Sequence, residues 1–213
     1  MNYIIKIVLK FLFPKRFIFA KIKNKDRKVA LTFDDGPYTA NTTELLNILR
    51  QEDIKATFFV LGENLEKYPD LSRDIADAGH EIGNHSFSHK KISDLGIERY
   101  WQDVQRTSEL IARHAKIKTC LFRPPYGEFN LSIFRGILKN SMVLAGWTLD
   151  SKDSWLKDKD GLIQYMQTRK VKSGDIILFH EDYGITIEAI SQIIKDLKKR
   201  GFNLVTVSEL QGA

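Results

Sequence analysis

Two adjacent carboxylates, Asp34 and Asp35, directly follow the apolar residues 29–33 and precede Gly36 and Pro37. The apolar run is typical of a buried strand, which the glycine and proline would end because glycine bends and proline cannot donate to a ladder. Neighbouring side chains of a strand point to opposite faces, so we do not expect the two carboxylates to share one partner. One could bind a cation while the other moves a proton; the alternative is a capping or turn role.

Two histidines, His85 and His89, follow the strand-like residues 81–83. If this segment forms a helical turn, side chains four residues apart lie on one face and both imidazoles can reach one metal ion. With an aspartate they would form a three-ligand site that keeps open positions, as catalytic metal sites do. Such histidine pairs are often incidental, so the prediction depends on their lying at the same sheet end as Asp34 and Asp35.

Arg123 emerges at the end of another apolar run and is followed by Pro124, Pro125 and Tyr126. An arginine there could form a bidentate pair with an aspartate such as Asp34 and so orient it. The two prolines restrict the loop, and the backbone amide of Tyr126 could face an oxyanion. A purely structural turn is the alternative.

Two further strand-like runs are followed by residues that could take part in chemistry. Residues 142–148 are followed by Asp150, Asp153 and Trp155, and residues 176–179 are followed by His180. A histidine at a strand end is commonly structural.

The remaining reactive residue types lack such a setting. His80 and His114 are predicted to have no role in the chemistry. Cys120 is the one cysteine of the chain, which excludes an internal disulfide framework, and its apolar neighbours predict a buried core thiol.

Strand-like and helix-like segments alternate from residue 28 onward, which predicts an α/β fold with a parallel sheet, and seven such units suggest barrel-like closure. The expected strands are residues 28–33, 55–61, 80–84, 119–122, 142–148, 175–179 and 202–207. The expected helices are residues 41–51, 69–78, 96–115, 130–140, 160–170 and 185–200. The acids, histidines and arginine named above follow five of these strands, so they lie at the carboxyl ends of the strands. Barrels and open parallel sheets place their active sites at this end, so the pattern indicates an enzyme.

Five segments in this order resemble the motifs of the polysaccharide deacetylase family, also called the NodB homology domain or carbohydrate esterase family four. They are Thr-Phe-Asp-Asp-Gly-Pro, His-Ser-x-x-His, Arg-Pro-Pro-Tyr-Gly, Asp-x-x-Asp and Leu-x-His. The resemblance covers residues 28 to about 207 and implies a distorted (β/α) barrel with about seven parallel strands. It also implies a metal-dependent hydrolase.

The resemblance implies roles for the first three motifs. Asp34 corresponds to the general base and Arg123 to the residue that orients it, while the Tyr126 amide forms part of the oxyanion hole. Three residues correspond to the ligands of one divalent metal ion, zinc or cobalt: Asp35, His85 and His89.

The last two motifs imply that His180 is the general acid, tuned by Asp153, and that Leu178 lines the acetyl pocket. The family's fourth motif usually runs Asp-Trp, whereas Ser154 separates Asp153 from Trp155 here. This departure leaves open whether Trp155 forms the wall of the groove and whether Asp150 replaces Asp153.

The expected reaction is removal of the N-acetyl group from N-acetylglucosamine-type residues of a glycan, such as peptidoglycan, a chitin-like polymer or poly-N-acetylglucosamine. The alternatives are an O-acetyl esterase acting on acetylated xylan and, in another class, an inactive carbohydrate-binding module. The connections after the strands are short, so we expect an open groove for an extended chain. Its rim would carry aromatic rings: Tyr38, Tyr126, Trp155 and Tyr183.

The charge of the chain is uneven. Residues 1–28 contain nine lysines and arginines and one acid, which leaves 24 basic and 26 acidic residues in 29–213 and argues against nucleic-acid binding. We expect a leader, residues 1–27, with an amphipathic helix, followed by a deacetylase domain, residues 28–213. The apolar part is too short and too charged to span a bilayer.

The leader allows three interpretations. Residues 1–20 could lie on an anionic membrane surface, the helix could dock on the domain, or the segment could be cleaved on secretion. We expect a monomer that is membrane-associated or in the cell envelope, with a cytoplasmic location as the alternative.

Overall fold

The structure is a computed structural model that describes residues 17–18 and 26–212. The helix expected near the N-terminus lies outside the described residues. Within the predicted leader, Phe17–Ile18 forms a short strand, β1, that pairs in parallel with Leu144 and Ala145. No described helix is long and apolar enough to cross a membrane.

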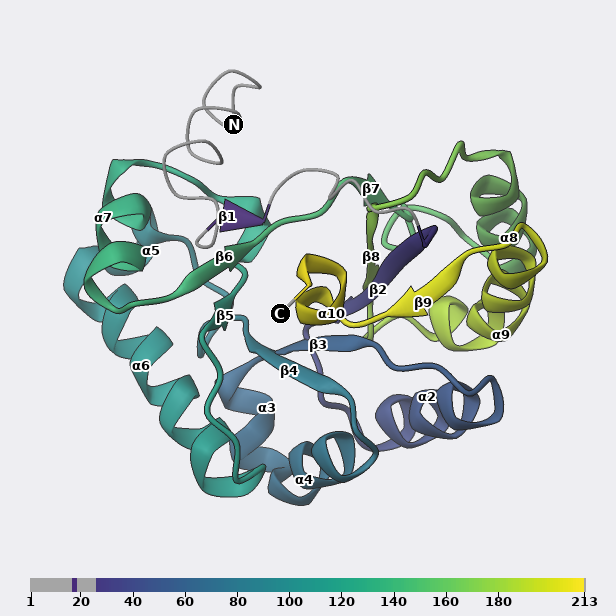
Figure 1. Cartoon of the computed structure of the whole chain (residues 1–213). Helices are drawn as coiled ribbons and strands as arrows, with labels where there is room; N and C mark the ends of the chain where they lie inside the picture. The colour runs from purple at the N-terminus through teal and green to yellow at the C-terminus, as the bar shows by residue number, and fades with distance from the viewer. Residues whose placement is uncertain (1–16, 19–25, 213) are drawn as a thin grey trace.

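The strands form one parallel sheet that curls into an incomplete barrel, with β1 and β7 at its two ends (Figure 1). The order is β1-β6-β5-β4-β3-β2-β8-β7, and β9 pairs with the first half of β2. The remaining strands are β2 (Lys28–Asp34), β3 (Thr57–Val60), β4 (Glu81–Asn84), β5 (Leu121–Phe122), β6 (Val143–Ala145), β7 (Leu149–Asp150), β8 (Ile176–His180) and β9 (Asn203–Val205). The predicted α/β barrel of about seven parallel strands is confirmed.

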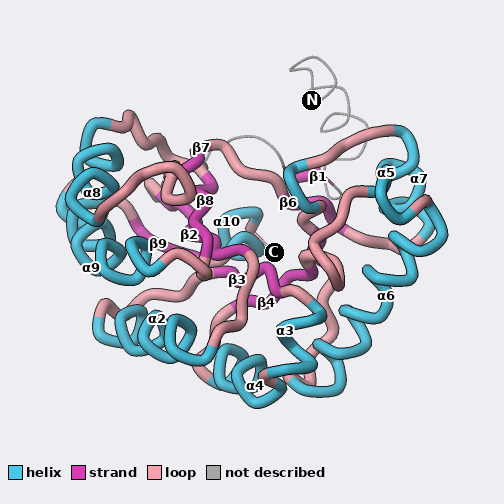
Figure 2. The backbone as a smooth tube through the Cα atoms, turned by 180° about the vertical axis from the view of Figure 1, so that it is seen from behind, coloured by secondary structure: helices cyan, strands magenta, loops and turns pink. Residues whose placement is uncertain are grey.

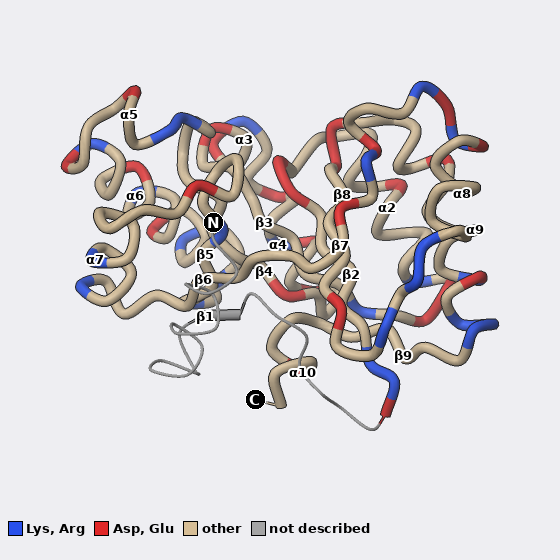
Figure 3. The backbone as a smooth tube through the Cα atoms, turned by 90° about the horizontal axis from the view of Figure 1, so that it is seen from above, with Lys and Arg blue, Asp and Glu red and all other residues tan. Residues whose placement is uncertain are grey.

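Helices surround the sheet on its outer side (Figures 1 and 2). They are α2 (Thr39–Gln51), α3 (Gly62–Lys67), α4 (Pro69–Asp77), α5 (Ile92–Leu95), α6 (Ile97–His114), α7 (Leu131–Lys139), α8 (Lys159–Thr168) and α9 (Gly184–Lys199). The short helix α10 (Val207–Gln211) instead lies inside the ring, against the barrel interior (Figure 1). The six expected helices are confirmed to within two residues at each end, because each has an apolar stripe that packs on the sheet. Acidic and basic positions are interspersed around the ring (Figure 3).

The barrel interior is filled at the end where the strands begin. Val207 and Leu210 of α10 pack with Ala30, Phe59 and other inward-facing side chains. The helix is tied to the first residue of β3, because the Val207 amide donates to Thr57 Oγ1 over 2.9 Å. The open end of the barrel is therefore the end where the strands finish.

Three expectations about local structure are wrong. The strand expected at residues 142–148 ends at Ala145, because a bend at residues 146–148 separates β6 from β7, and the strand expected at 202–207 ends early because Val207 begins α10. Cys120 is exposed and free. It precedes the two-residue strand β5, whose Leu121 and Phe122 are the buried residues of that segment.

Candidate metal centre and active site

Three side chains converge at the open end of the barrel. Asp35 Oδ1 lies 3.5 Å from His85 Nε2 and 3.4 Å from His89 Nε2, and the three ligand atoms all lie within 4.8 Å of one another. Asp35 Oδ1 is buried and accepts no hydrogen bond from the part of the chain that the structure describes. Burial lowers the pKa of both histidines, which favours the neutral rings that bind metals. An orphaned carboxylate oxygen facing two neutral imidazoles fits a divalent cation.

The two histidines reach this position from a loop. Residues 85–91 are not helical, so the predicted helical turn is wrong; Ser86 and His89 have φ values of 71° and 53°. The Ser86 amide donates to Asn84 Oδ1 over 2.8 Å, and the His89 amide donates to Ser86 Oγ over 3.2 Å. His85 Nδ1 donates to the Arg123 carbonyl over 2.6 Å, which leaves Nε2 unprotonated toward Asp35.

Asp34 and Asp35 both face His85, contrary to the expectation that they would not share a partner. His85 Nε2 lies 3.6 Å from Asp34 Oδ2 and 3.5 Å from Asp35 Oδ1. The alternation of side chains stops at Asp34, the last residue of β2, because Asp35 has a left-handed backbone with φ 73°. Burial, and then the charge of Asp34, raise the pKa of Asp35.

Arg123 is fully buried and contacts Asp34 directly. Its Nη1 donates to Asp34 Oδ1 over 2.6 Å and also to Thr32 Oγ1 over 2.8 Å. Nε and Nη2 donate to the carbonyls of Ala145 and Gly146. A bidentate pair was expected, but only Nη1 of Arg123 contacts Asp34. The other guanidinium nitrogens bind carbonyls at the end of β6 and in the bend after it, so Asp34 Oδ2 is left facing His85.

His180, at the end of β8, pairs with Asp153. His180 Nδ1 lies 2.8 Å from Asp153 Oδ1, while Asp153 Oδ2 accepts from the His180 amide and the Thr186 hydroxyl. Burial lowers the pKa of His180, but the bond to Asp153 and its charge outweigh it and raise this pKa to about 9. Asp150 instead pairs with Lys152 over 2.8 Å, so Asp153 is the partner of the histidine.

These groups surround one cavity of about 280 Å³. Its lining residues are Asp34, Asp35, His85, His89, Tyr126, Gly127, Trp147, Asp150, Ser154, Leu178, His180 and Tyr183. Trp155 is 81% exposed and is not among them.

The indole in the cavity wall is that of Trp147, which the sequence reasoning missed. A Cβ added at Gly127 would lie 2.6 Å from this ring, so the Arg123–Gly127 motif and Trp147 are packed together. Trp147 occupies the bend between β6 and β7, and Gly146, which directly precedes it, is the signal in the sequence that could have indicated this bend.

Residues 21–143 match the family described as polysaccharide deacetylase. The chain belongs to this family. It is 33% identical, over 92% of its own length and 94% of the relative's, to a peptidoglycan-N-acetylglucosamine deacetylase of Bacillus cereus. It is 34% identical to the peptidoglycan-N-acetylmuramic acid deacetylase PdaC of Bacillus subtilis over 86% of this chain, and the match spans 38% of PdaC.

Solved structures of the family have the same fold. The crystal structure of the Bc1960 peptidoglycan N-acetylglucosamine deacetylase matches with a TM-score of 0.87 and 32% identity, over 95% of both chains. A pseudoenzyme of carbohydrate esterase family four from Bacillus anthracis matches with a TM-score of 0.84 and 28% identity, over 92% of this chain and 69% of that one. The predicted family, fold and class of amide hydrolase are confirmed.

Proposed function

We propose that this chain is a metal-dependent deacetylase that hydrolyses the N-acetyl group of N-acetylglucosamine-type residues in a glycan. One observation carries the proposal: the three ligand atoms of Asp35, His85 and His89 open onto the same cavity as Asp34 and His180. Ligands and two proton-transfer groups in one small cavity are what amide hydrolysis at a metal requires.

Asp35, His85 and His89 would hold the cation. Two imidazole nitrogens and one carboxylate oxygen suit zinc or cobalt better than magnesium or calcium, which prefer oxygen ligands. When bound, the ion would polarise the acetamide carbonyl and make water a better nucleophile at neutral pH.

The side chains around this centre divide the proton transfers. Asp34, oriented by Arg123 through Oδ1, has Oδ2 available to take a proton from the attacking water. His180, paired with Asp153, would protonate the departing amine.

Two residues act on the acetyl group itself. The Tyr126 amide is assigned to the developing oxyanion, and buried Leu178 forms the apolar wall for the acetyl methyl.

The names of the relatives favour peptidoglycan as the glycan and hence the cell envelope as the place of action. The pseudoenzyme among the structural neighbours shows that the fold alone does not ensure turnover. Activity in this chain is supported by the presence of a base, an acid and three ligands at one site.

The test is acetate release from N-acetylated peptidoglycan and chitin fragments and from O-acetylated xylan, with and without a chelator. We expect release from the N-acetylated substrates that stops on chelation, while circular dichroism stays native-like because the ligands come from an already packed barrel. Release from xylan alone would indicate the esterase, and no release with metal present would indicate the inactive module.

The substitution Asp34→Asn distinguishes the proposed role of Asp34 as the base from that of Asp35 as a metal ligand. It should keep metal binding and lower the rate by about 10²- to 10⁴-fold, as expected for a lost general base. Asp53→Asn, at an exposed turn with φ 46°, is the matched control. Loss of the metal in Asp34→Asn would mean that the roles of Asp34 and Asp35 are reversed.

We also propose that residues 1–20 contact an anionic membrane surface, on the strength of their lysines and apolar residues alone. A chain beginning at Phe17 would keep β1 and its pairing with β6. It should stay active but no longer sediment with anionic vesicles; unchanged sedimentation would contradict the proposal.

A further inference from the structure

Glu181 is a fully buried acid for which the mechanism has no use. It follows His180 and lies against the loop that carries Asp35. Its Oε1 accepts a hydrogen bond from the Thr42 hydroxyl, which in turn accepts from the Tyr38 amide. Its Oε2 is buried and has no hydrogen-bond partner among the described residues. Burying a carboxyl with one oxygen unpaired is unfavourable, so a compensating role is expected.

The unpaired oxygen lies against Gly36, the residue after Asp35. A Cβ built on Gly36 would lie 1.9 Å from Glu181 Oε2. Gly36 does not have a left-handed φ, so the lack of space rather than backbone conformation requires glycine here. The side chain of Glu181 therefore fills the space beside the Gly36 Cα.

The backbone at Asp35 needs such support because its φ of 73° is unfavourable for a residue other than glycine. One side of the loop is held by β3 and α3: Asp35 N donates to the Phe59 carbonyl over 3.2 Å, and Asn64 Nδ2 donates to the Asp35 carbonyl over 2.7 Å. Strand β2 lies between β3 and β8 in the sheet, so Glu181, which follows β8, supports the loop from the other side.

We propose that Glu181 is a positioning residue that fixes the metal ligand Asp35 by packing its carboxyl between Thr42 and Gly36. Without this contact the loop can relax away from φ 73°, and Asp35 Oδ1 no longer stays within 3.5 Å of both imidazoles. The inference rests on the proposed metal centre. Glu181 would then touch neither metal nor substrate, yet it would determine how tightly the metal binds.

The carboxyl acts by its shape and its bond to Thr42. Burial raises the pKa of Glu181 to about 7, although the hydrogen bond from Thr42 acts to lower it. The uncharged form of the carboxyl is therefore accessible near neutral pH. Glutamine, which has the same shape and keeps an acceptor for Thr42, should therefore replace glutamate, whereas alanine should not.

The test measures the dissociation constant of Zn²⁺ by competition with a chromophoric chelator, together with the melting temperature. We expect Glu181→Ala and Thr42→Val to weaken Zn²⁺ binding by about 10- to 100-fold, the usual effect of losing a residue that orients a metal ligand. Glu181→Gln should stay within about threefold of the unsubstituted protein. The control is Glu188→Ala, an exposed position on α9, which should not change Zn²⁺ affinity.

A double substitution tests the contact with Gly36. Gly36→Ala alone should weaken Zn²⁺ binding because the new Cβ overlaps Glu181 Oε2. In a Glu181→Ala background it should cost little more, because the space is then free, so the two effects should be non-additive. Gly184→Ala is the matched control, because an added Cβ there would meet none of the described residues beyond its chain neighbours and its own helix within 4 Å.

The outcomes separate this inference from the proposed function. If the unsubstituted protein binds no Zn²⁺, the metal centre itself is wrong and the inference falls with it. If it binds Zn²⁺ and Glu181→Ala or Thr42→Val binds equally well, only the positioning role is overturned, even where the melting temperature falls. Additive effects of Gly36→Ala and Glu181→Ala would likewise overturn it.

Discussion

Arg123 and Asp34 lie 89 residues apart in the chain, yet Arg123 Nη1 and Asp34 Oδ1 are 2.6 Å apart in the buried centre of the barrel. The guanidinium is stacked 4.0 Å from the centre of the Phe59 ring and also donates to the carbonyls of Ala145 and Gly146. One side chain thus orients the expected base and joins two distant strands of the sheet.

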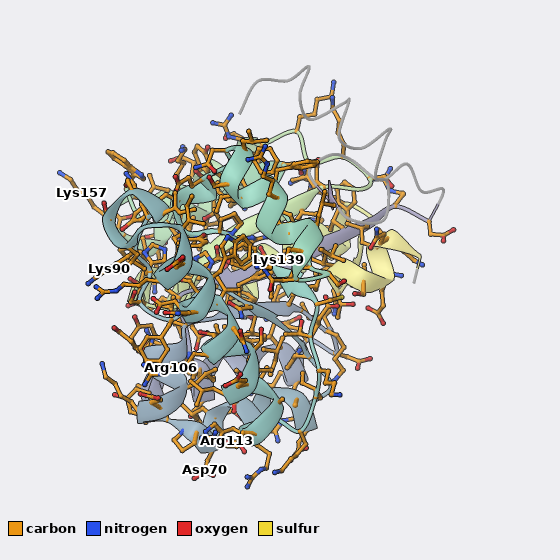
Figure 4. The ribbon with its side chains drawn as sticks, turned by 90° about the vertical axis from the view of Figure 1, so that its left-hand side faces the viewer. Asp70, Lys90, Arg106, Arg113, Lys139 and Lys157 are labelled. Carbon is orange, nitrogen blue, oxygen red and sulfur yellow. The ribbon has the colours of Figure 1, made fainter. Side chains whose placement is uncertain are left out.

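Replacing Arg123 with Met should lower the free energy of unfolding by about 3–5 kcal/mol, because it leaves Asp34 buried without its counter-charge. Denaturant unfolding followed by circular dichroism measures this loss. The control, Arg113→Met, changes an exposed arginine on the outer side of α6 (Figure 4). A loss below about 1 kcal/mol in Arg123→Met, as for a surface ion pair, would contradict the structure.

The bond between Asp153 and His180 predicts a shift in the pH profile of activity. The carboxylate stabilises the protonated ring and so raises the pKa of His180. Asp153→Asn removes this charge, so the pKa of His180 should fall. Because a general acid must be protonated to act, the alkaline limb of kcat should move to lower pH.

The measurement is kcat against pH for the unsubstituted protein and for Asp153→Asn. Asp150→Asn is the matched control because Asp150 lines the same cavity but pairs with Lys152. An alkaline limb that does not move in Asp153→Asn, or that moves equally in both variants, would show that His180 is not the acid tuned by Asp153.

The sequence was sufficient to predict the sheet, the six longer helices and the end of the barrel that holds the site. Parallel strands bring their carboxyl ends together, so polar residues after separate apolar runs had to meet, whatever the details of the loops. Asp34 and His180 line one cavity for this reason, and Arg123 contacts Asp34.

The details that the sequence could not supply depend on loop backbone. The left-handed φ of Asp35, Ser86 and His89 brings the ligands together, and none of these residues is a glycine whose presence would have indicated it. The bend after β6 places Trp147 in the cavity wall and leaves Trp155 exposed.

His80 is predicted to make stability depend on pH. It is buried, its Nδ1 accepts from the Ala56 amide, and burial, with the charge of Lys55, lowers its pKa from 6.5 to about 4. In the unfolded chain His80 therefore binds a proton near pH 6.5, whereas in the folded protein it stays neutral until the pH approaches 4. The contribution of neutral His80 to the free energy of unfolding is therefore fully present above pH 6.5. It falls by roughly 3 kcal/mol as the pH drops toward 4.

His80→Asn keeps an acceptor for the Ala56 amide but cannot titrate. The difference in unfolding free energy between the unsubstituted protein and this variant should shrink as the pH falls from 7 to 4. Taking the difference cancels the other titrating groups that the two proteins share. A constant difference across this range would mean that His80 is not held neutral by burial.

The size of the site predicts how the rate depends on substrate length. A cavity of about 280 Å³ is at the small end of ligand pockets, so it can take the acetamide and little beyond its own sugar. The neighbouring sugars must then lie on the surface around it. Tyr126 and Tyr183 line the cavity and are 62% and 36% exposed, so their rings can pack on those sugars.

We therefore expect the rate on N-acetylglucosamine oligomers to rise from dimer to pentamer, with little activity on the monosaccharide, because binding of remote sugars positions the acetamide. Tyr126→Asn removes the ring while tolerating the left-handed backbone at this position, φ 58°. It should lower kcat/KM on the pentamer by a larger factor than on the dimer. Trp155→Ala, outside the cavity, should affect only the longest substrates. Equal efficiency on monosaccharide and pentamer, or an equal loss in Tyr126→Asn on all lengths, would contradict an extended binding surface.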